Sequence, residues 1–381
     1  MNVSFNINIL NQLLLRDTER ARDVTARFPK IYEWTNNQSW PTYLQLVSLA
    51  NYFNIPFGYF FLNAIPERKY PIPHYRSISD RSFKPSQDLL ETIQLVQKRQ
   101  EWAKDILKEF QSPLKFAKSI STKTSIADAA ILVRQILGLP INWSESANLE
   151  TWNDAFKYLL NKTEEAGIFV VVNGIVNNNT SRALNISEFR GFVLYDNYAP
   201  FIFINNRDFI TGKIFTIVHE IVHILIGESA SFDFTNLMPA DNTIEEYCNA
   251  VTAEFLVPKS ILETHFEKTG AKFDTIAKIF KVSRIVIARR LLDLKKISKK
   301  EFIEAYNSFR NTSIENPNVD KKEGGGGDFY NTAPYRISRN FFNLVYTSVK
   351  QEKMLYRDAF RLTGLSAKTF DGYVKEYLTS N

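Results

Sequence analysis

Two histidines and a glutamate near the middle of the chain have the types and the spacing of a metal-dependent hydrolytic site. Residues 219–223 read His-Glu-Ile-Val-His. On a helix, positions four apart lie on one face, so His219 and His223 can bind the same metal ion. Glu220 lies beside them and can take a proton from a metal-bound water. This HExxH spacing predicts a zinc site with Glu220 as the general base.

The neighbours of these three residues predict a buried helix. Apolar side chains surround it on nearly all sides: Ile217, Val218, Ile221, Val222, Ile224, Leu225 and Ile226. A helix that is apolar all round is typical of a protein interior. Buried histidines and a buried glutamate are costly unless something satisfies them, and a metal ion does so. The alternative is a hydrogen-bonded core network without a metal. Gly227 predicts the end of the helix.

A third protein ligand is needed, because catalytic zinc usually keeps three protein ligands and one open position. A helix predicted over residues 244–257, ended by Pro258, supplies the candidates. Glu245 is the first choice and Glu246 the second. From spacing alone, an exposed residue favoured by the helix dipole explains Glu245 equally well. Cys248 could also bind zinc, but a free cysteine more often packs as a small buried residue.

Helices and a few short strands must position these residues. Apolar periodicity predicts helices over residues 85–110, 125–138 and 152–162, and helices again dominate after the strands. Short β-branched or aromatic runs predict strands at 167–172, 192–195 and 201–204. The sequence therefore predicts an α+β fold that is mainly helical, with a small sheet beside the HExxH helix.

The composition limits the class of protein. The chain has 381 residues, 44% hydrophobic and 14% aromatic, which suits roughly two or three packed domains. Its single cysteine excludes an intrachain disulfide and fits a reducing compartment. No basic leader precedes an apolar stretch at the start, and no uncharged apolar run approaches the roughly 18–20 residues needed to cross a bilayer. We therefore expect a cytoplasmic protein with no membrane partner.

Changes in composition predict five segments. Proline-rich residues 66–73 and four glycines at 324–327 are the sharpest breaks, and Pro41 is expected to open a helix in its first turn. The expected segments are a helical bundle at 1–75, the metal-site domain with its helical lead-in at 76–260, a second helical unit at 261–315, a glycine-rich linker at 316–327 and a C-terminal helical segment at 328–381.

The net charge of +6 is concentrated in one part of the chain. Residues 281–300 hold eight basic side chains against Asp293 alone, a local charge of +7. A helix at 276–280, a turn and a second helix capped by Ser283 predict a helix-turn-helix. Arg284, Arg289 and Arg290 could then meet DNA phosphates. The alternatives are a solvated helical surface and a helical unit that packs under the catalytic domain.

Several of these stretches, in this order, resemble the ImmA/IrrE family of metallopeptidases. They lie at residues 188–192, 199–205, 217–223, 245–258 and 282–292. The resemblance implies a gluzincin-like site in which His219 and His223 bind zinc and Glu220 is the base. It also implies that Glu245, four residues before Asn249, is the third ligand. Residues 251–252 depart from the family's usual Phe-Ala, which is a change in packing.

Both ends of the chain resemble the longer members of this family. Residues 34–62 are similar to their N-terminal helix-turn-helix-like region, and residues 326–330 and 356–359 to their C-terminal tail. Such proteins are often interpreted as regulators, or as antitoxins beside a toxin, whereas shorter members cleave a transcriptional repressor. The resemblance thus implies helix-turn-helix-like bundles that flank the peptidase core, with a toxin or DNA as further partners.

The residues and the resemblance together predict a zinc-dependent endopeptidase that cleaves a regulatory protein, repressor-like or antitoxin-like. Manganese or iron could take the place of zinc. The substrate is expected to add as a β-strand to an edge of the sheet near residues 192–195 or 201–204. Arg190, Tyr195 and Tyr198 are candidates for stabilising the oxyanion.

The competing hypothesis is a DNA-binding regulator or antitoxin of a toxin–antitoxin-like pair, with a structural or idle zinc site. Such a protein would bind DNA with a strong dependence on salt. The intact Glu220 favours the enzyme, because a structural site needs no base.

Overall fold

The computed structural model describes residues 2–16, 18–53, 55–65, 85–228, 230–232, 243–315 and 334–377. Contacts divide the chain into two compact units, Met1–Tyr70 with Ser77–Leu90, and Pro71–Arg76 with Glu91–Asn381. The proline-rich stretch at 66–73 and the glycine-rich linker at 316–327 lie outside the described residues. No helix within the described ranges is both long and apolar enough to cross a bilayer.

The first unit is a small helical bundle. Its elements are α1 (Ile7–Arg16), α2 (Thr18–Arg27), α3 (Ile31–Thr35), α4 (Tyr43–Tyr52) and the 3-10 helix η1 (Phe57–Phe61). Before α4, the Thr42 hydroxyl accepts the Gln45 N–H while the Gln45 side chain accepts the Thr42 N–H, a reciprocal cap that fixes the start of the helix. Pro41 therefore precedes the cap, and its expected place in the first turn is wrong.

The second unit is built around a four-stranded sheet in the order β1-β5-β4-β6. The strands are β1 (Phe169–Asn173), β4 (Gly191–Leu194), β5 (Phe201–Asn205) and β6 (Ala230–Phe232). β1 runs parallel to β5, and β4 runs antiparallel to both β5 and β6. A separate hairpin, β2 (Ile175–Val176) and β3 (Asn179–Ala183), follows β1. The sequence predicted β1, β4 and β5, and it missed the short β6 and the polar hairpin.

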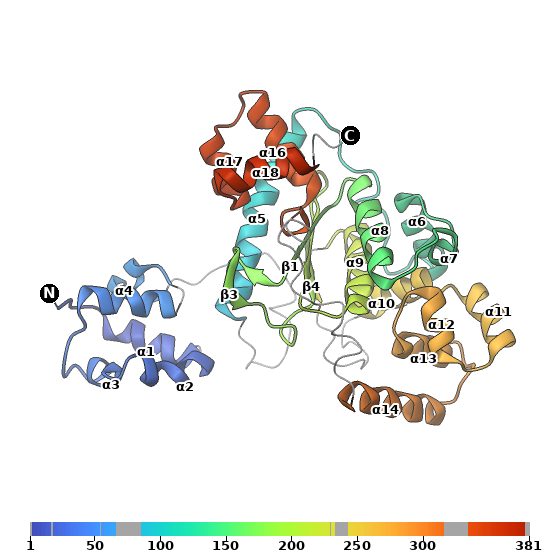
Figure 1. Ribbon diagram of the computed structural model, residues 1–381, viewed down its shortest axis with the longest axis horizontal. Coiled ribbons are helices and arrows are strands. Elements are labelled where there is room, and N and C mark those ends of the chain that lie inside the picture. Colours follow the sequence, from blue (N-terminus) through green and yellow to red (C-terminus); the bar gives the residue numbers. More distant parts are fainter. Residues whose placement is uncertain are drawn as a thin grey trace. The chain divides into compact units, whose positions relative to one another are not determined.

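Helices cover both faces of this sheet (Figure 1). The α+β, mainly helical class predicted from the sequence is confirmed. The helices before and within the sheet region are α5 (Gln87–Lys108), α6 (Ile126–Leu137), α7 (Trp143–Ser146), α8 (Trp152–Glu165) and α9 (Ile210–Ile226). Those after it are α10 (Thr243–Leu256), α11 (Lys259–Thr269), α12 (Phe273–Phe280), α13 (Arg284–Asp293), α14 (Lys299–Glu315), η3 (Pro334–Arg336), α16 (Arg339–Lys350), α17 (Tyr356–Thr363) and α18 (Ala367–Tyr377).

One face of the sheet packs against α8 and α9. Successive strand residues point to opposite faces, and on this face Val170, Ile202 and Val193 join one apolar core with α9. The same core continues through α10 and includes Ile276 and Leu291 of α12 and α13. The predicted helix pair after residue 270 therefore shares its buried side with the helices of the HExxH region.

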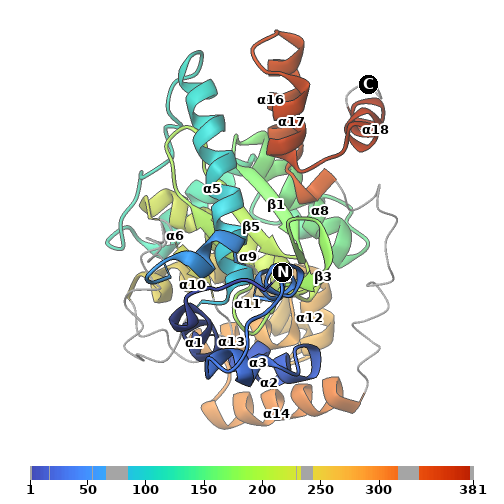
Figure 2. The same cartoon turned by 90° about the vertical axis from the view of Figure 1, so that its left-hand side faces the viewer.

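The opposite face is aromatic and is covered by α5 and by the C-terminal helices (Figures 1 and 2). Phe169 and Phe201 stack with their centroids 4.7 Å apart, and the Phe341 ring of α16 meets both edge-on. Edge-to-face pairs of this kind add to the energy of burial. The Arg99 guanidinium of α5 donates to the carbonyls of Leu362 and Thr363 at the end of α17. The C-terminal helices are therefore an integral layer of this unit.

A buried carboxyl group joins the C-terminal layer to α8. The side chain of Glu164 accepts a hydrogen bond from the Ser338 hydroxyl, and its backbone carbonyl accepts one from the Asn340 amide. Burial raises the pKa of Glu164 from its ordinary value of 4.5 to about 7, against the opposing effect of Ser338. Burial thus favours the protonated form of this carboxyl group up to about pH 7.

Glu164 should make the stability of the protein depend on pH. Because its folded-state pKa lies above its unfolded value, its stabilisation is complete below about pH 4.5 and is lost as the pH rises to about 7. We expect Glu164→Gln to remove that loss, roughly 2–3 kcal/mol between pH 4.5 and 8. Urea unfolding of both proteins across this range measures it. Parallel stability profiles for wild type and variant would show that Glu164 does not titrate in this way.

Candidate metal centre

Helix α9 carries the HExxH residues through the core. Its residues from Ile214 to Leu225 are all buried, and His219, Glu220 and His223 have no exposed surface. The helix ends as predicted at Gly227, which adopts a left-handed conformation with φ 88°, a backbone state that glycine enters without strain. A Cβ there would also lie 2.7 Å from Lys118 Cγ. The end of α9 is thus fixed directly after its second histidine.

Helix α10 brings an acidic side chain to the two histidines. Val251 and Phe255 bury one side of α10 in the core shared with α9. Glu245 lies in its first turn and forms a candidate metal-binding group with His219 and His223. Glu246, the second choice from the sequence, is exposed. Cys248 is buried, and it is not part of the group.

The distances within this group fit one tetrahedral metal ion. His219 Nε2 lies 3.1 Å from Glu245 Oε2 and 3.1 Å from His223 Nε2. His223 Nε2 lies 3.3 Å from Glu245 Oε1. Zinc bonds of about 2.0–2.1 Å at tetrahedral angles place two ligand atoms about 3.3 Å apart. The three side chains therefore already have the spacing that a bound zinc ion requires.

The electrostatics of the group suit a cation. Burial lowers the pKa of His219 to about 4, so this imidazole is neutral at pH 7 and keeps a lone pair for a metal. Burial alone would raise the pKa of Glu245, but its hydrogen bonds to His219 and His223 outweigh burial and hold that pKa below its ordinary value. The group thus combines a neutral imidazole with an ionised carboxylate, which is the donor set of a zinc site.

Glu220 is a buried carboxyl group that no described residue satisfies. It has no exposed surface, and neither carboxylate oxygen has a hydrogen-bond partner within the described part of the chain. Burial raises the pKa of Glu220 well above its ordinary value, and the charge of Glu245 raises it further. A carboxyl group in such a place costs stability. Its position suits a group that exchanges a proton with a ligand of the metal.

Two further residues support the site, and neither was singled out as functional from the sequence. Asn249 lies one turn beyond Glu245 on α10, and its side chain acts on the pKa of His219 against the effect of burial. Gly191 begins β4 beneath α9. The signals in the sequence were the spacing of four from Glu245 to Asn249 and a glycine at the start of a strand, where another group can approach closely.

Gly191 lets α9 lie directly on the sheet. A Cβ at this position would lie 2.5 Å from Thr216 Cγ2, 2.8 Å from the Phe203 carbonyl oxygen and 3.6 Å from Glu220 Oε1. We expect Gly191→Ala to lower the free energy of unfolding by about 1–3 kcal/mol, because α9 must shift. The control is Gly58→Ala, where a Cβ meets nothing within 4 Å. Equal unfolding midpoints for the two variants would rule out this close contact.

The candidates for oxyanion stabilisation have other partners. Arg190 Nη1 donates to Asp208 Oδ1 at 2.8 Å, which ties the start of β4 to the start of α9. The Tyr195 hydroxyl bonds to the Asn197 side chain, and the Lys108 ammonium lies 5.9 Å from the centre of the Tyr198 ring. None of these contacts is with His219, His223 or Glu245.

The arginines expected at DNA phosphates are held by the protein. Arg290 is 8% exposed, pairs with Glu254 and donates to the Val257 carbonyl. That burial argues against a phosphate contact, because a guanidinium in the interior cannot reach DNA. Arg284 lies 4.9 Å from the centre of the Phe309 ring of α14, and Arg289 bonds to Asp293. Local charge in the sequence did not reveal which of these side chains face inward.

Two family models match the chain. The Peptidase M78 model, described as the IrrE N-terminal-like domain, matches residues 163–292, from the end of α8 through most of α13. A domain of unknown function (DUF8813) matches residues 337–376, which include α16 and α17. No curated protein is similar enough to match. The resemblance to the ImmA/IrrE family is therefore confirmed over residues 163–292, and it indicates a metallopeptidase type of domain.

Proposed function

We propose that this chain is a zinc-dependent endopeptidase, with His219, His223 and Glu245 as the metal ligands and Glu220 as the general base. The observation that supports this most is Glu220 itself. It is fully buried, has no hydrogen-bond partner for either oxygen among the described residues and lies beside the three-ligand group. A structural zinc site has no use for such a carboxylate, whereas hydrolysis requires one.

When bound, zinc polarises the scissile carbonyl and lowers the pKa of a water molecule. Glu245 and the two histidines would hold the ion, and Asn249 would support His219 from the next turn of α10. Glu220 takes a proton from the attacking water as the water oxygen bonds to the carbonyl carbon. The same carboxyl group then gives the proton to the amide nitrogen as the C–N bond breaks. Gly191 keeps Glu220 close to the start of β4.

The strand order decides which edge of the sheet a substrate strand could reach. β5 is paired on both sides, with β1 and β4, and β4 is paired on both sides, with β5 and β6. A substrate expected at an edge near residues 192–195 or 201–204 can therefore pair only with a neighbouring strand. β6 pairs with β4 alone among the described strands, and its Phe232 is opposite Gly191. We propose that a peptide adds to the outer side of β6.

The proposed substrate is a regulatory protein, repressor-like or antitoxin-like. This part rests on the resemblance to the ImmA/IrrE family and on the family match over residues 163–292. Zinc is proposed from the donor set of two imidazoles and one carboxylate, a set that manganese or iron can also use. The helix-turn-helix-like character of the flanking segments is part of the same proposal.

The competing proposal of a DNA-binding regulator has less support from the geometry. A reading helix must present a free face to the major groove. α13 packs against both α12 and α14, and it buries Ile287, Ala288 and Leu291. In the first unit, α3 has only five residues, which is short for a helix that reads DNA. Binding of DNA or of a toxin is therefore kept as an outcome of the test.

The test uses the full chain loaded with zinc and the repressor-like or antitoxin-like proteins encoded beside it. Mass spectrometry of each mixture should reveal one partner cut at a defined bond, and chelator-treated protein should leave that partner intact. If no partner is cut and the protein instead shifts DNA in a salt-dependent way or neutralises a toxin, the regulator replaces the enzyme.

A further inference from the structure

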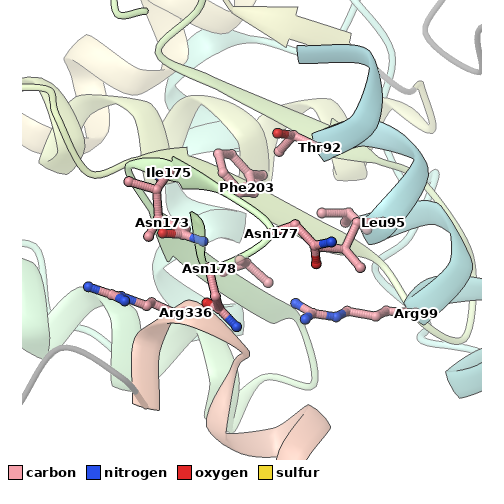
Figure 3. A pocket seen from close by; sticks show the side chains of 11 residues that line it. Thr92, Leu95, Arg99, Asn173, Ile175, Asn177, Asn178, Phe203 and Arg336 are labelled. Atoms are coloured by element: carbon pink, nitrogen blue, oxygen red, sulfur yellow. Dashed lines mark hydrogen bonds between the residues drawn. The ribbon is translucent and has the colours of Figure 1, made fainter. Parts of the chain in front are cut away.

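A pocket lies on the aromatic side of the sheet, away from α9. It is enclosed by α5, by the ends of β1 and β5, by the turn between β2 and β3, and by η3 (Figure 3). Val171 and Phe203 form its floor, and they alternate with Val170 and Ile202, which face α9. Its empty volume of about 320 Å³ includes space that is open to solvent. The enclosed part is small, so a ligand would bind through a single small charged group at the mouth of the pocket.

The walls of this pocket are polar and basic. Two arginines, Arg99 and Arg336, and three asparagines, at 173, 177 and 178, line it, and no aspartate or glutamate does. Arginine and side-chain amides donate hydrogen bonds, and a basic lining without carboxylates favours an anion.

Arg99 is the strongest indication of an anionic ligand. Its side chain is 3% exposed, and it has no carboxylate partner among the described residues. Nε and Nη2 donate to the carbonyls of Leu362 and Thr363 at 3.2 and 2.9 Å, and no hydrogen bond from Nη1 occurs within the described chain. The guanidinium points into the pocket (Figure 3). The carbonyls at the end of α17 offset part of the cost of burying the guanidinium, and Nη1 remains available for a ligand.

The turn between β2 and β3 brings amide groups to the same place. Asn177 and Asn178 have positive φ angles of 48° and 63°, as in the tight hairpin turns that asparagine and glycine favour. The Asn178 amide donates to the Gly364 carbonyl at 3.2 Å, which ties the turn to the loop after α17. Asn177 lines the pocket beside it. The β2–β3 turn and the neighbouring α5 are thus held so that their hydrogen-bond donors face the same pocket.

We propose that this pocket binds a phosphate group, either as inorganic phosphate or as the phosphate of a small phosphorylated molecule. The planar fork of Arg99 suits a tetrahedral oxyanion, and the asparagine amides supply neutral donors. A bound phosphate would join α5, the β2–β3 turn and η3, and so would stabilise the packing of the C-terminal helices on the sheet. The site is independent of the proposed peptidase activity, because it lies on the other face.

The test is thermal unfolding of the full chain with inorganic phosphate, compared with chloride at equal ionic strength. Phosphate should raise the melting temperature by about 2–4 °C, since a ligand stabilises the folded state that binds it. Asn177→Asp should abolish the increase, because its carboxylate repels the anion and can pair with Arg99. Aspartate also tolerates the positive φ at this position.

The matched control is Asn179→Asp, which adds the same charge two residues away on the same hairpin. Asn179 is exposed, and its side-chain oxygen accepts from the Ser181 N–H, a role that aspartate retains. This variant should keep the full response to phosphate. An increase with adenosine monophosphate but not with inorganic phosphate, lost in Asn177→Asp, would assign the site to a phosphorylated small molecule. No phosphate-specific increase in wild type, or an equal one in Asn177→Asp, would overturn the proposal.

Discussion

Glu220→Gln should bind one metal ion as wild type does and should lose peptide cleavage by about 10²–10⁴-fold, the usual contribution of a general base. The substitution keeps the size of the side chain and removes its ability to take a proton. It also removes a carboxyl group whose burial is unfavourable, since Glu220 has no exposed surface and a raised pKa. The variant should therefore unfold at an equal or higher denaturant concentration. Metal content, cleavage rate and the unfolding midpoint are measured on the same samples.

The matched control is Glu246→Gln, which makes the same change at an exposed position of α10. It should retain both metal and activity. If Glu220→Gln cut the substrate at the wild-type rate, another group would have to be the base. If it lost its metal, Glu220 would be a ligand, and the proposed division of roles would be wrong.

Glu245→Ala should weaken metal binding by at least about 100-fold, because loss of a ligand exceeds the effect typical of supporting residues. The remaining histidines, whose Nε2 atoms lie 3.1 Å apart, would hold the ion by two bonds alone. Competition with a chromogenic chelator measures the affinity. The stabilisation that metal gives to wild type against heat should largely disappear in the variant.

Glu246→Ala is the control for this second substitution. It removes a carboxylate from the same turn of α10 but from outside the metal-binding group. Its metal affinity should equal that of wild type. The opposite result, with loss of metal in Glu246→Ala alone, would mean that the start of α10 turns differently in the metal-bound protein.

The sequence was sufficient where the chemistry depends on local spacing. His219 and His223 lie four residues apart on one helix, and a left-handed glycine ends that helix where it was expected. Buried runs of β-branched and aromatic residues likewise revealed β1, β4 and β5. In each case, the interaction that gives the pattern lies within one element, so that a window of a few residues contains it.

The sequence was insufficient where the structure depends on contacts between distant segments. The strand order β1-β5-β4-β6 places β4 and β5, near which a substrate strand was expected, inside the sheet, and no local pattern reveals which strand is at an edge. Arg290 occurs in a basic run, yet it is buried and pairs with Glu254, which lies 36 residues earlier in the chain. From spacing alone, an exposed residue explained Glu245 as well as a metal ligand did, because only the packing of α10 on α9 brings it to the histidines.

The most direct test of the central claim is X-ray absorption at the zinc edge of the zinc-loaded full chain. A catalytic site with His219, His223 and Glu245 predicts a first shell of nitrogen and oxygen alone, at about 2.0–2.1 Å, with a solvent oxygen as the fourth ligand. That spectrum would support a site that is open to a substrate. A sulfur ligand at about 2.3 Å, supplied by Cys248 as the single cysteine of the chain, would contradict the account. A chain that takes up no zinc would contradict it as well.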